Sequence, residues 1–147
     1  MKQGIDYIGV TCVFYCHDGS GNLLLHKRSQ KCRDERGRWD CGGGAMKMGE
    51  TFEQTVRREV KEEYSTEIQK LQLVSVSNVL RKHDAKLTHW IAVLFALQLN
   101  PKKVKIGDSE KMDKIGWFKP NNLPKPLHSM FLTHLQYVKD AGIIESD

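Results

Sequence analysis

Hydrophobic positions follow two different periods along the chain, and the change of period separates expected helices from expected strands. From 51 to 64 the large apolar side chains recur every fourth residue, which predicts an amphipathic helix, and a second helix is expected over about 129–139. Shorter apolar or alternating runs predict strands over 7–15, from 23 onward, and over 71–79, 89–99 and 115–118. The nearly continuous apolar run at 90–95 predicts a strand buried on both faces. Strands mixed with two helices indicate an α/β domain.

Each expected helix has one apolar face, while the segment before the first helix has no such pattern. The faces expected to be buried are Phe52, Val56, Val60 and Tyr64 in the first helix and Phe131, Leu135 and Val138 in the second. Residues 27–43 are rich in charge and end in consecutive glycines, so we expect a loop there.

The composition is that of a single globular domain covering residues 1–147. Hydrophobic residues make up 39% of the chain and charged residues 28%, which is ordinary for such a domain. No apolar run approaches the roughly 20 residues needed to cross a bilayer, so no membrane partner is expected. The start has no signal-peptide core, so we expect a cytoplasmic protein whose four cysteines are reduced thiols.

Three carboxylates are placed together on the first expected helix. Glu59, Glu62 and Glu63 fall within an arc of about 100° at helical spacing. Their charges repel one another unless a cation lies among them. Carboxylate oxygens are ligands for a hard divalent cation, so this pattern predicts a Mg²⁺ or Mn²⁺ site.

The rest of the chain is basic, with a formal net charge of +5 overall. Residues 27–38 hold six basic and two acidic side chains, a net charge of +4. An acidic, metal-attracting helix in a basic protein suits a polyanionic substrate such as a diphosphate. Arg28 and Arg33 are candidates for a distal phosphate, and Trp39 for stacking on a base or anchoring the loop. No aromatic-rich basic motif favours nucleic acid as the partner.

The segment 44–66 resembles the Nudix hydrolase box, G-x5-E-x7-R-E-U-x-E-E-x-G-U, in which U is a bulky aliphatic residue. The positions in register are Gly44, Glu50, Arg58, Glu59, Val60, Glu62 and Glu63. The chain departs from the box at Ser65 and Thr66, where glycine and an aliphatic residue are expected. A glycine after a helix often adopts a positive φ, so we expect this helix to end differently, with Ile68 as the aliphatic anchor.

The resemblance implies an α/β/α sandwich around a mixed β-sheet, and an enzyme that cleaves a nucleoside diphosphate linked to another moiety. It implies that Glu59, Glu62, Glu63 and the carbonyl of Gly43 bind the metal. Arg58 would hold a neighbouring glutamate, and Glu50 would assist or bind a second metal. Glu110, ahead of Trp117 and Phe118, would complete the metal shell or act as general base, or it is a solvated glutamate paired with a lysine. Nudix proteins are often homodimers.

Three other interpretations stay open at the sequence level. Leu24, Leu25, Arg28, Ser29, Arg33, Gly37, Gly43 and Gly44 match part of the pattern of coenzyme A-directed Nudix enzymes. A Nudix-fold module that binds a nucleotide without cleaving it is the second, and it would fit the altered Ser65–Thr66 end. The third is an isopentenyl-diphosphate isomerase, which needs a reactive cysteine; Cys41 lies near the glycines, although a buried thiol is the simpler account.

Overall fold

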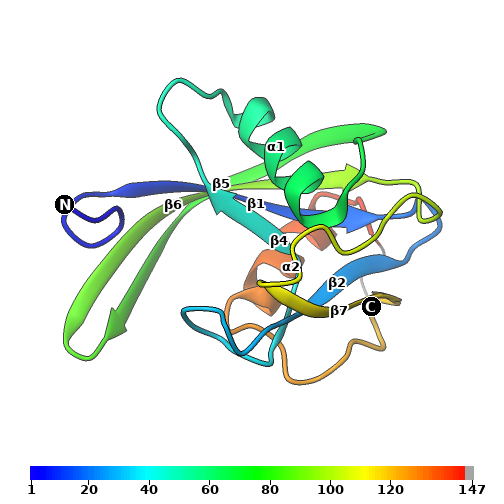
Figure 1. Cartoon of the computed structure of the whole chain (residues 1–147). Helices are drawn as coiled ribbons and strands as arrows, with labels where there is room; N and C mark the ends of the chain where they lie inside the picture. Colours follow the sequence, from blue (N-terminus) through cyan, green and yellow to red (C-terminus); the bar gives the residue numbers. More distant parts are fainter. Residues whose placement is uncertain (145–147) are drawn as a thin grey trace.

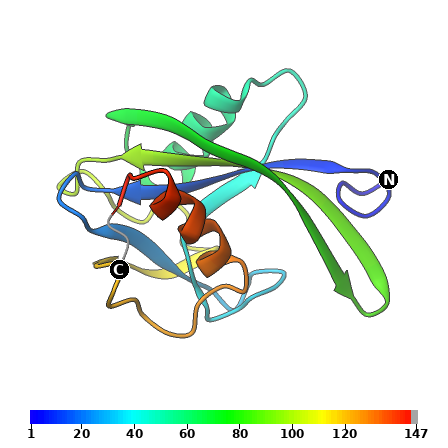
Figure 2. The same cartoon turned by 180° about the vertical axis from the view of Figure 1, so that it is seen from behind.

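A mixed β-sheet lies between two helices in the computed structural model, which describes residues 1–144 apart from the side chain of His83. Helix α1 covers one face of the sheet and α2 the other, as the two opposite views in Figures 1 and 2 show. The elements are β1 (Gly9–His17), β2 (Leu23–Arg28), β3 (Trp39–Asp40), β4 (Gly42–Ala45), α1 (Phe52–Tyr64), β5 (Lys70–His83), β6 (Lys86–Gln98), β7 (Met112–Phe118) and α2 (Phe131–Asp140). The predicted α/β/α sandwich is confirmed.

The strand order explains why the sheet is mixed. The main path runs β3-β2-β1-β6-β5, while β4 pairs with β1 and β7 pairs with β2. Strands β1 and β6 are parallel, and the other pairs are antiparallel. Residues 92–97 of β6 are buried, because this strand is central and a helix covers each face. The prediction of burial on both sides, made for 90–95, is confirmed for residues 92–95, whereas Trp90 and Ile91 are half-buried.

Alternation along the central strands divides the interior into two cores. On β1, Cys12, Phe14 and Cys16 point toward α1 and contact a cluster that includes Val56, Val60 and Tyr64. The intervening Tyr15 belongs to a second cluster with Phe131, Leu135 and Val138 of α2. Ile68 packs against the first core, as expected for the substitute aliphatic anchor.

The segment 27–43, expected to be a loop, contains the end of β2, all of β3 and the start of β4. Strand β4 pairs antiparallel with β1, with Gly43 opposite Val13 and Gly44 opposite Cys12. Glycine has a poor strand propensity, so the glycine run indicated a loop. The long-range pairing with β1 overrides that local preference.

The β5–β6 hairpin is longer than the sequence pattern indicated. We expected strands to stop at 79 and to restart at 89, but pairing continues to His83 opposite Lys86. The turn residues Asp84 and Ala85 have φ values of 48° and 67°, the left-handed conformation that a two-residue hairpin loop requires. Figure 1 shows the far end of this hairpin projecting beyond both helices.

The remaining boundaries differ by a few residues. Strand β1 begins at Gly9 instead of 7, β7 begins at Met112 instead of 115, and α2 begins at Phe131 instead of 129. Phe52 was expected to be buried but is 42% exposed, because it is the first residue of α1 and lies at the end of the apolar stripe. No helix within residues 1–144 is long and apolar enough to cross a bilayer.

Candidate active site

Helix α1 carries the acidic cluster, and its own sequence fixes where it begins and ends. The Thr51 hydroxyl accepts a hydrogen bond from the Gln54 amide at 3.2 Å, and the Gln54 side chain accepts one from the Thr51 amide at 2.8 Å. This capping box satisfies two amide groups at the start of the helix. At the other end Ser65 adopts the left-handed conformation itself, with φ 57° and ψ 32°. The expectation that the helix would end differently is therefore wrong.

Arg58 holds the acidic residues of the cluster in one network. Its Nε and Nη2 atoms donate to the two oxygens of Glu50 at 2.7 and 2.9 Å, and Nη1 donates to Glu59 Oε1 at 2.6 Å. Nη2 also reaches the Ala45 carbonyl at 3.2 Å, which ties α1 to β4. Glu62 Oε2 lies 3.6 Å from Nη1. Hydrogen bonding to Arg58 lowers the pKa of Glu50 to about 2, so Glu50 stays ionised near neutral pH.

Glu59 and Glu63 lie under the glycine strand β4. A Cβ atom at Gly44 would lie 2.2 Å from the Glu59 carboxylate, and one at Gly42 would lie 2.9 Å from Glu63 Oε2. A side chain at Gly44 would therefore displace the Glu59 carboxylate, and one at Gly42 would clash first with the Phe14 ring, at 2.2 Å, and then with Glu63. This close approach explains why glycines precede the helix at this point.

Burial raises the pKa of both of these carboxyl groups. For Glu63 burial is the main cause, and the nearby charge of Glu59 adds to it, while Lys111 and the Gly43 backbone act in the opposite direction. For Glu59 burial also dominates, against the hydrogen bond from Arg58. Glu63 Oε2 is buried and has no hydrogen-bond partner. A buried carboxylate oxygen without a partner is unfavourable unless a cation or proton compensates it.

The donor set fits a hard divalent cation, because it consists of carboxylate oxygens and one of them is buried without a partner. Among residues 1–144, however, no group of three or more His, Cys, Asp or Glu side chains stands ready to hold an ion. Arg58 engages Glu59, and the Glu62 side chain is 50% exposed beside it. Metal binding would thus require these two side chains to turn away from Arg58.

Next to Glu63 in the chain, Tyr64 belongs to a group of buried, hydrogen-bonded polar groups that no sequence pattern predicts. Tyr64 donates its hydroxyl hydrogen to the Cys41 carbonyl at 2.6 Å, and His26 Nδ1 lies 2.7 Å from the same hydroxyl. Because the hydroxyl has one hydrogen, His26 Nδ1 carries the proton of the second bond. Burial lowers the pKa of His26 to about 4, so its ring is neutral near pH 7. The three residues are far apart in the sequence, and no local pattern links them.

A cavity of about 1040 Å³ opens beside this cluster, between β4, the β5–β6 hairpin and the N-terminal segment. The residues around it include Lys2, Tyr7, His26, Arg28, Arg33, Gly42, Gly43, Gly44, Glu63, Arg81, Trp90, His128 and His134. Its acidic lining is Glu63 with Asp34 and Asp40, and its basic lining is Lys2, Arg28, Arg33 and Arg81. A cavity of this composition and size can accept an anionic ligand as large as a nucleotide.

Known proteins resemble most of this chain in sequence. The model of the NUDIX domain matches residues 7–139. The chain belongs to the Nudix family. It is 30% identical over 138 residues to mouse 8-oxo-dGDP phosphatase NUDT18, and 28% identical to the human protein of that name. These matches cover 92% of this chain but only 39% of each relative.

Solved Nudix structures share the fold. A MutT NUDIX hydrolase from Burkholderia pseudomallei superposes with a TM-score of 0.80 at 26% identity, over 90% of this chain and 99% of that one. The NUDIX domain of NrtR from Shewanella oneidensis, complexed with ADP ribose, superposes with a TM-score of 0.70 at 17% identity, over 96% and 90% of the two chains. The first match places the chain beside a protein described as a hydrolase, and the second shows the fold alone.

The candidate substrate-binding residues outside the Nudix box differ in whether they border the large cavity. Arg28 and Arg33 both border the cavity, but Arg28 is held by Asp34 at 3.0 Å, whereas Arg33 is exposed. Trp39 is not among the cavity residues; its ring packs edge-on against Phe118, with centroids 5.3 Å apart. This packing in the α2-side core matches the second of the two alternatives for Trp39, that of an anchor for the loop.

Glu110 lies outside the Nudix acidic cluster as the chain stands. Its carboxylate is 69% exposed and pairs with Lys31 at 2.8 Å. It is not among the residues around the large cavity. This arrangement matches the solvated, lysine-paired glutamate that was one of the two expectations.

The cysteines show no sign of reactivity in this Nudix domain. All four are buried and unpaired. Burial, with Asp40 as the next cause, raises the pKa of Cys41 well above its usual value. A reactive thiolate needs a lowered pKa, so the arrangement does not favour the isomerase interpretation.

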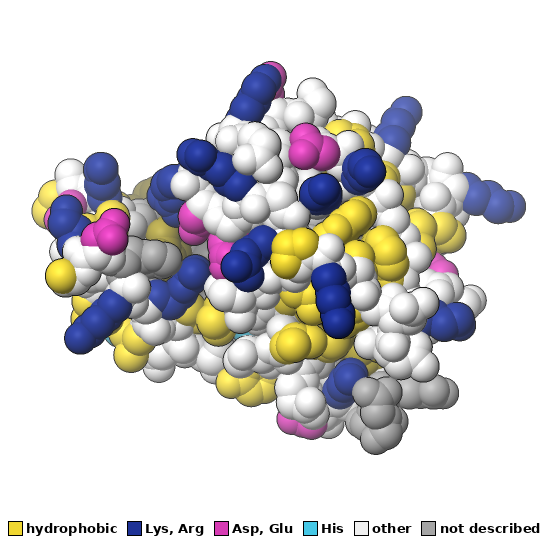
Figure 3. All heavy atoms as spheres, turned by 90° about the horizontal axis from the view of Figure 1, so that it is seen from below, with side chains coloured by type: hydrophobic (Ala, Val, Ile, Leu, Met, Phe, Trp, Pro, Cys, Tyr) yellow, Lys and Arg dark blue, Asp and Glu magenta, His cyan; other side chains and the backbone are white. Residues whose placement is uncertain are grey.

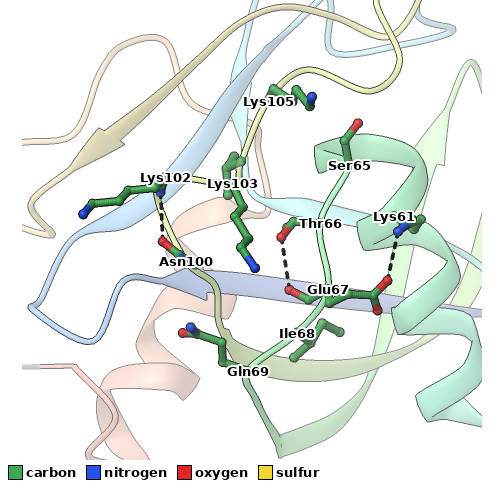
Figure 4. Close-up of a pocket in the computed structure, with 11 residues that line it drawn as sticks. Lys61, Ser65, Thr66, Glu67, Ile68, Gln69, Asn100, Lys102, Lys103 and Lys105 are labelled. Carbon is green, nitrogen blue, oxygen red and sulfur yellow. Dashed lines mark hydrogen bonds and ion pairs between the residues drawn. The ribbon is translucent and has the colours of Figure 1, made fainter.

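A second cavity, of about 470 Å³, lies at the far end of α1 and lacks comparable chemistry. Lys61, Lys102, Lys103 and Lys105 surround it, with Glu67 as its only acidic residue. Figure 4 shows that Lys102 and Lys105 extend away from Lys103, and that Lys61 reaches Glu67. These ammonium groups do not converge on one point, so the candidate active site is the larger cavity beside Glu63.

Proposed function

We propose that this Nudix protein is a Mg²⁺- or Mn²⁺-dependent pyrophosphohydrolase that cleaves a nucleoside diphosphate derivative to a monophosphate and a second phosphate product. The observation that carries the proposal is the buried, unpartnered oxygen of Glu63, a box acid that borders the cavity of about 1040 Å³. A structural acid would have its oxygens satisfied by the protein. A carboxylate that borders a cavity and has an oxygen without a hydrogen-bond partner is suited to binding a cation.

Glu59, Glu62, Glu63 and the carbonyl of Gly43 would hold the metal. When bound, it would lower the pKa of a coordinated water and neutralise charge on phosphate oxygens. Arg58 positions Glu59 and Glu50 through the hydrogen bonds described above. Arg33 would contact a distal phosphate from the exposed loop, with Arg28 behind it. Glu110 would act as general base or further ligand only after it leaves Lys31.

The substrate class is best approached through the curated relatives. They are named as 8-oxo-dGDP phosphatases, so oxidised guanine nucleoside diphosphates lead the candidates for this chain. Nucleoside triphosphates, ADP-ribose, dinucleoside polyphosphates and coenzyme A complete the panel. Nucleic acid has less support: on the face seen in Figure 3, Lys and Arg side chains stand singly and form no continuous basic stripe. A cytoplasmic location and a homodimeric assembly remain proposals.

The test is turnover of this panel with Mg²⁺ or Mn²⁺, with released phosphates separated by chromatography. Wild type should cleave one compound much faster than the others. Glu62→Gln and Glu63→Gln should each lower the rate for that compound to the rate seen with the rest of the panel. Glu53→Gln is the matched control, because Glu53 is on the same helix but is exposed and paired with Arg57 at 2.8 Å. Unchanged turnover in both box variants would refute the mechanism.

The rival function is a nucleotide-binding module without catalysis. The observation that favours it is the engagement of Glu59 and Glu62 by Arg58, which leaves no ready group of three ligands among the described residues. Calorimetric titration of the same panel separates the two functions. Tight binding without product would favour the module, whereas metal-dependent product release that requires Glu63 would exclude it.

A further inference from the structure

Residues 1–7 form a compact loop that is attached to strand β6. We call them the N-terminal segment, and Figures 1 and 2 both show this loop beside the β5–β6 hairpin. Within it the Gly4 amide donates to the Tyr7 carbonyl at 2.7 Å, and Gln3 and Tyr7 form a parallel β-bridge. The His89 amide donates to the Gly4 carbonyl at 2.8 Å. The segment therefore has a defined place on the sheet.

Two glycines let the backbone of this region approach the Trp90 ring closely. A Cβ atom at Gly4 would lie 2.1 Å from the Trp90 indole nitrogen, and one at Gly9 would lie 2.5 Å from the six-membered ring. Either Cβ would push the ring away, and Gly4 also has a φ of 76°, which favours glycine. The position of Trp90 thus depends on the N-terminal segment.

Apolar side chains gather in the large cavity where this segment meets Trp90. Ile5 and Tyr7 border the cavity and are 44% and 46% exposed. Trp90 and Val79 are opposite each other in the β5–β6 pairing and border the cavity as well. Large apolar side chains that stay accessible in a cavity with charged walls indicate a ligand that covers them.

The strand register separates this apolar group from the glycine strand β4. Gly9 is opposite Trp90, and Val13, four residues further along β1, is opposite Gly43. Four residues of a strand span about 13 Å. Glu63 borders the same cavity as the apolar group. A nucleotide has a matching order of parts, with charged phosphates at one end and a flat aromatic base at the other.

We propose that the N-terminal segment is a base-binding wall of this cavity, in which Tyr7 stacks on the nucleobase and Ile5 and Trp90 flank it. The inference rests on the proposed function, because it takes the ligand of the cavity to be a nucleotide. Aromatic side chains stack on every base, since every base has a π-face. The wall contributes affinity for the base, while the glycine strand and Glu63 lie at the phosphates.

The test measures binding of three purine nucleoside monophosphates, 8-oxo-dGMP, GMP and AMP, by isothermal titration calorimetry with Mg²⁺ present. These probes have no phosphoanhydride bond, so binding is measured without turnover. Wild type should bind at least one probe, and Tyr7→Leu should weaken that binding by about tenfold, because an aliphatic side chain cannot stack. Tyr7→Phe, which keeps the ring, should restore the affinity to within about threefold of wild type.

Tyr137→Leu is the matched control, because Tyr137 is 37% exposed on α2 and is not among the residues around the cavity. Its affinity should equal that of wild type. Gly4→Ala tests the wall without changing Tyr7: the added methyl group would displace the segment from Trp90, so binding should weaken as much as in Tyr7→Leu. Circular dichroism checks that each variant is folded.

Failure of wild type to bind any of the three probes would overturn the proposal. So would equal affinity of Tyr7→Leu and Tyr7→Phe, unchanged binding in Gly4→Ala, or an equal loss in Tyr137→Leu. Hydrolysis is measured separately on the diphosphate panel. Binding that depends on Tyr7 in a protein without turnover would contradict the proposed enzyme and leave the base-binding wall in place.

Discussion

Glu63 occupies a position where its own burial opposes its negative charge. One carboxylate oxygen is buried without a partner, and the second acid of the cluster, Glu59, lies close enough to raise its pKa further. A residue selected for stability alone would not be ionisable here. The arrangement is typical of a functional site, where stability is given up for chemistry.

Glu63→Gln should therefore separate stability from activity. Without metal at pH 8, the free energy of unfolding should rise by about 1 kcal/mol, because a neutral amide is less costly to bury than a carboxylate. Turnover should fall by about 100-fold or more, since even outer-shell changes at metal sites cost roughly 10–100-fold. Urea unfolding with a chelator and steady-state kinetics measure the two effects. A Gln variant that is both less stable and equally active would contradict the assignment.

Ser65, at the end of the same helix, adopts a backbone conformation that is unfavourable for its residue type. Its φ of 57° is costly for a residue with a Cβ atom, and the Nudix pattern has glycine at this position. Ser65→Gly should raise the free energy of unfolding by about 0.5–1 kcal/mol. Ser77→Gly is the control: the chemical change is the same, but Ser77 is within β5, where glycine should destabilise. Thermal or urea unfolding of both variants tests whether the effects have opposite signs.

At the scale of elements, helix α1 was predictable and strand β4 was not. The stripe Val56–Val60–Tyr64 and the carboxylate face are local patterns, and the structure contains both of them. The glycine strand has no side-chain pattern to read, and its position over Glu59 and Glu63 depends on its pairing with β1. The burial of those acids therefore could not be inferred from the sequence.

A second element-scale feature joins the hairpin to the loop before β3 and to the start of α2. Arg81 Nη2 donates to Ser129 Oγ at 3.2 Å and lies 3.7 Å from Glu35 Oε1. The Ser129 amide donates to that same Glu35 oxygen at 3.0 Å. Burial would raise the pKa of Glu35, but the bonds from Ser129 and the nearby cations lower it overall. The ionised Glu35 thus links three elements around the cavity.

Arg81→Gln should loosen this link and raise KM by about three- to tenfold, with little change in kcat, because the cavity wall moves but the box does not. Glu35→Gln should have a similar effect, and the double variant should be no worse than either single one. Lys82→Gln is the control, since the neighbouring side chain points to the opposite face of the hairpin. Additive losses in the double variant would show that the two residues act separately.

At the scale of the whole molecule, the sequence predicted the fold class and the two core-forming helix faces, while the assembly of the site depended on distant residues. Arg58 and Glu50 were expected together because they share one motif, and they are bonded. His26 and Tyr64 had no such link, because they come from β2 and α1 and meet only in the folded core. Periodicity identifies which face of an element is buried, but not what it meets.

The burial of His26 also makes the stability of the whole domain depend on pH. The pKa of His26 is about 4 in the folded protein, below its ordinary value of 6.5. Burial is the main cause; Asp40 acts against it, while Arg28 and His128 add to it. Between these two values the unfolded chain binds more protons than the folded one, so acid favours unfolding in that window.

The free energy of unfolding should consequently fall by about 2 kcal/mol from pH 7 to pH 4.5 through His26 alone. His26→Gln keeps a group that can bond Tyr64 but does not titrate, so this part of the pH dependence should vanish. His89→Gln is the control, because His89 is bonded to Asn78 on the exposed hairpin. Urea unfolding at several pH values measures the difference between each variant and wild type. A difference for His26→Gln that stays constant with pH would mean that the buried ring is not what makes the fold sensitive to acid.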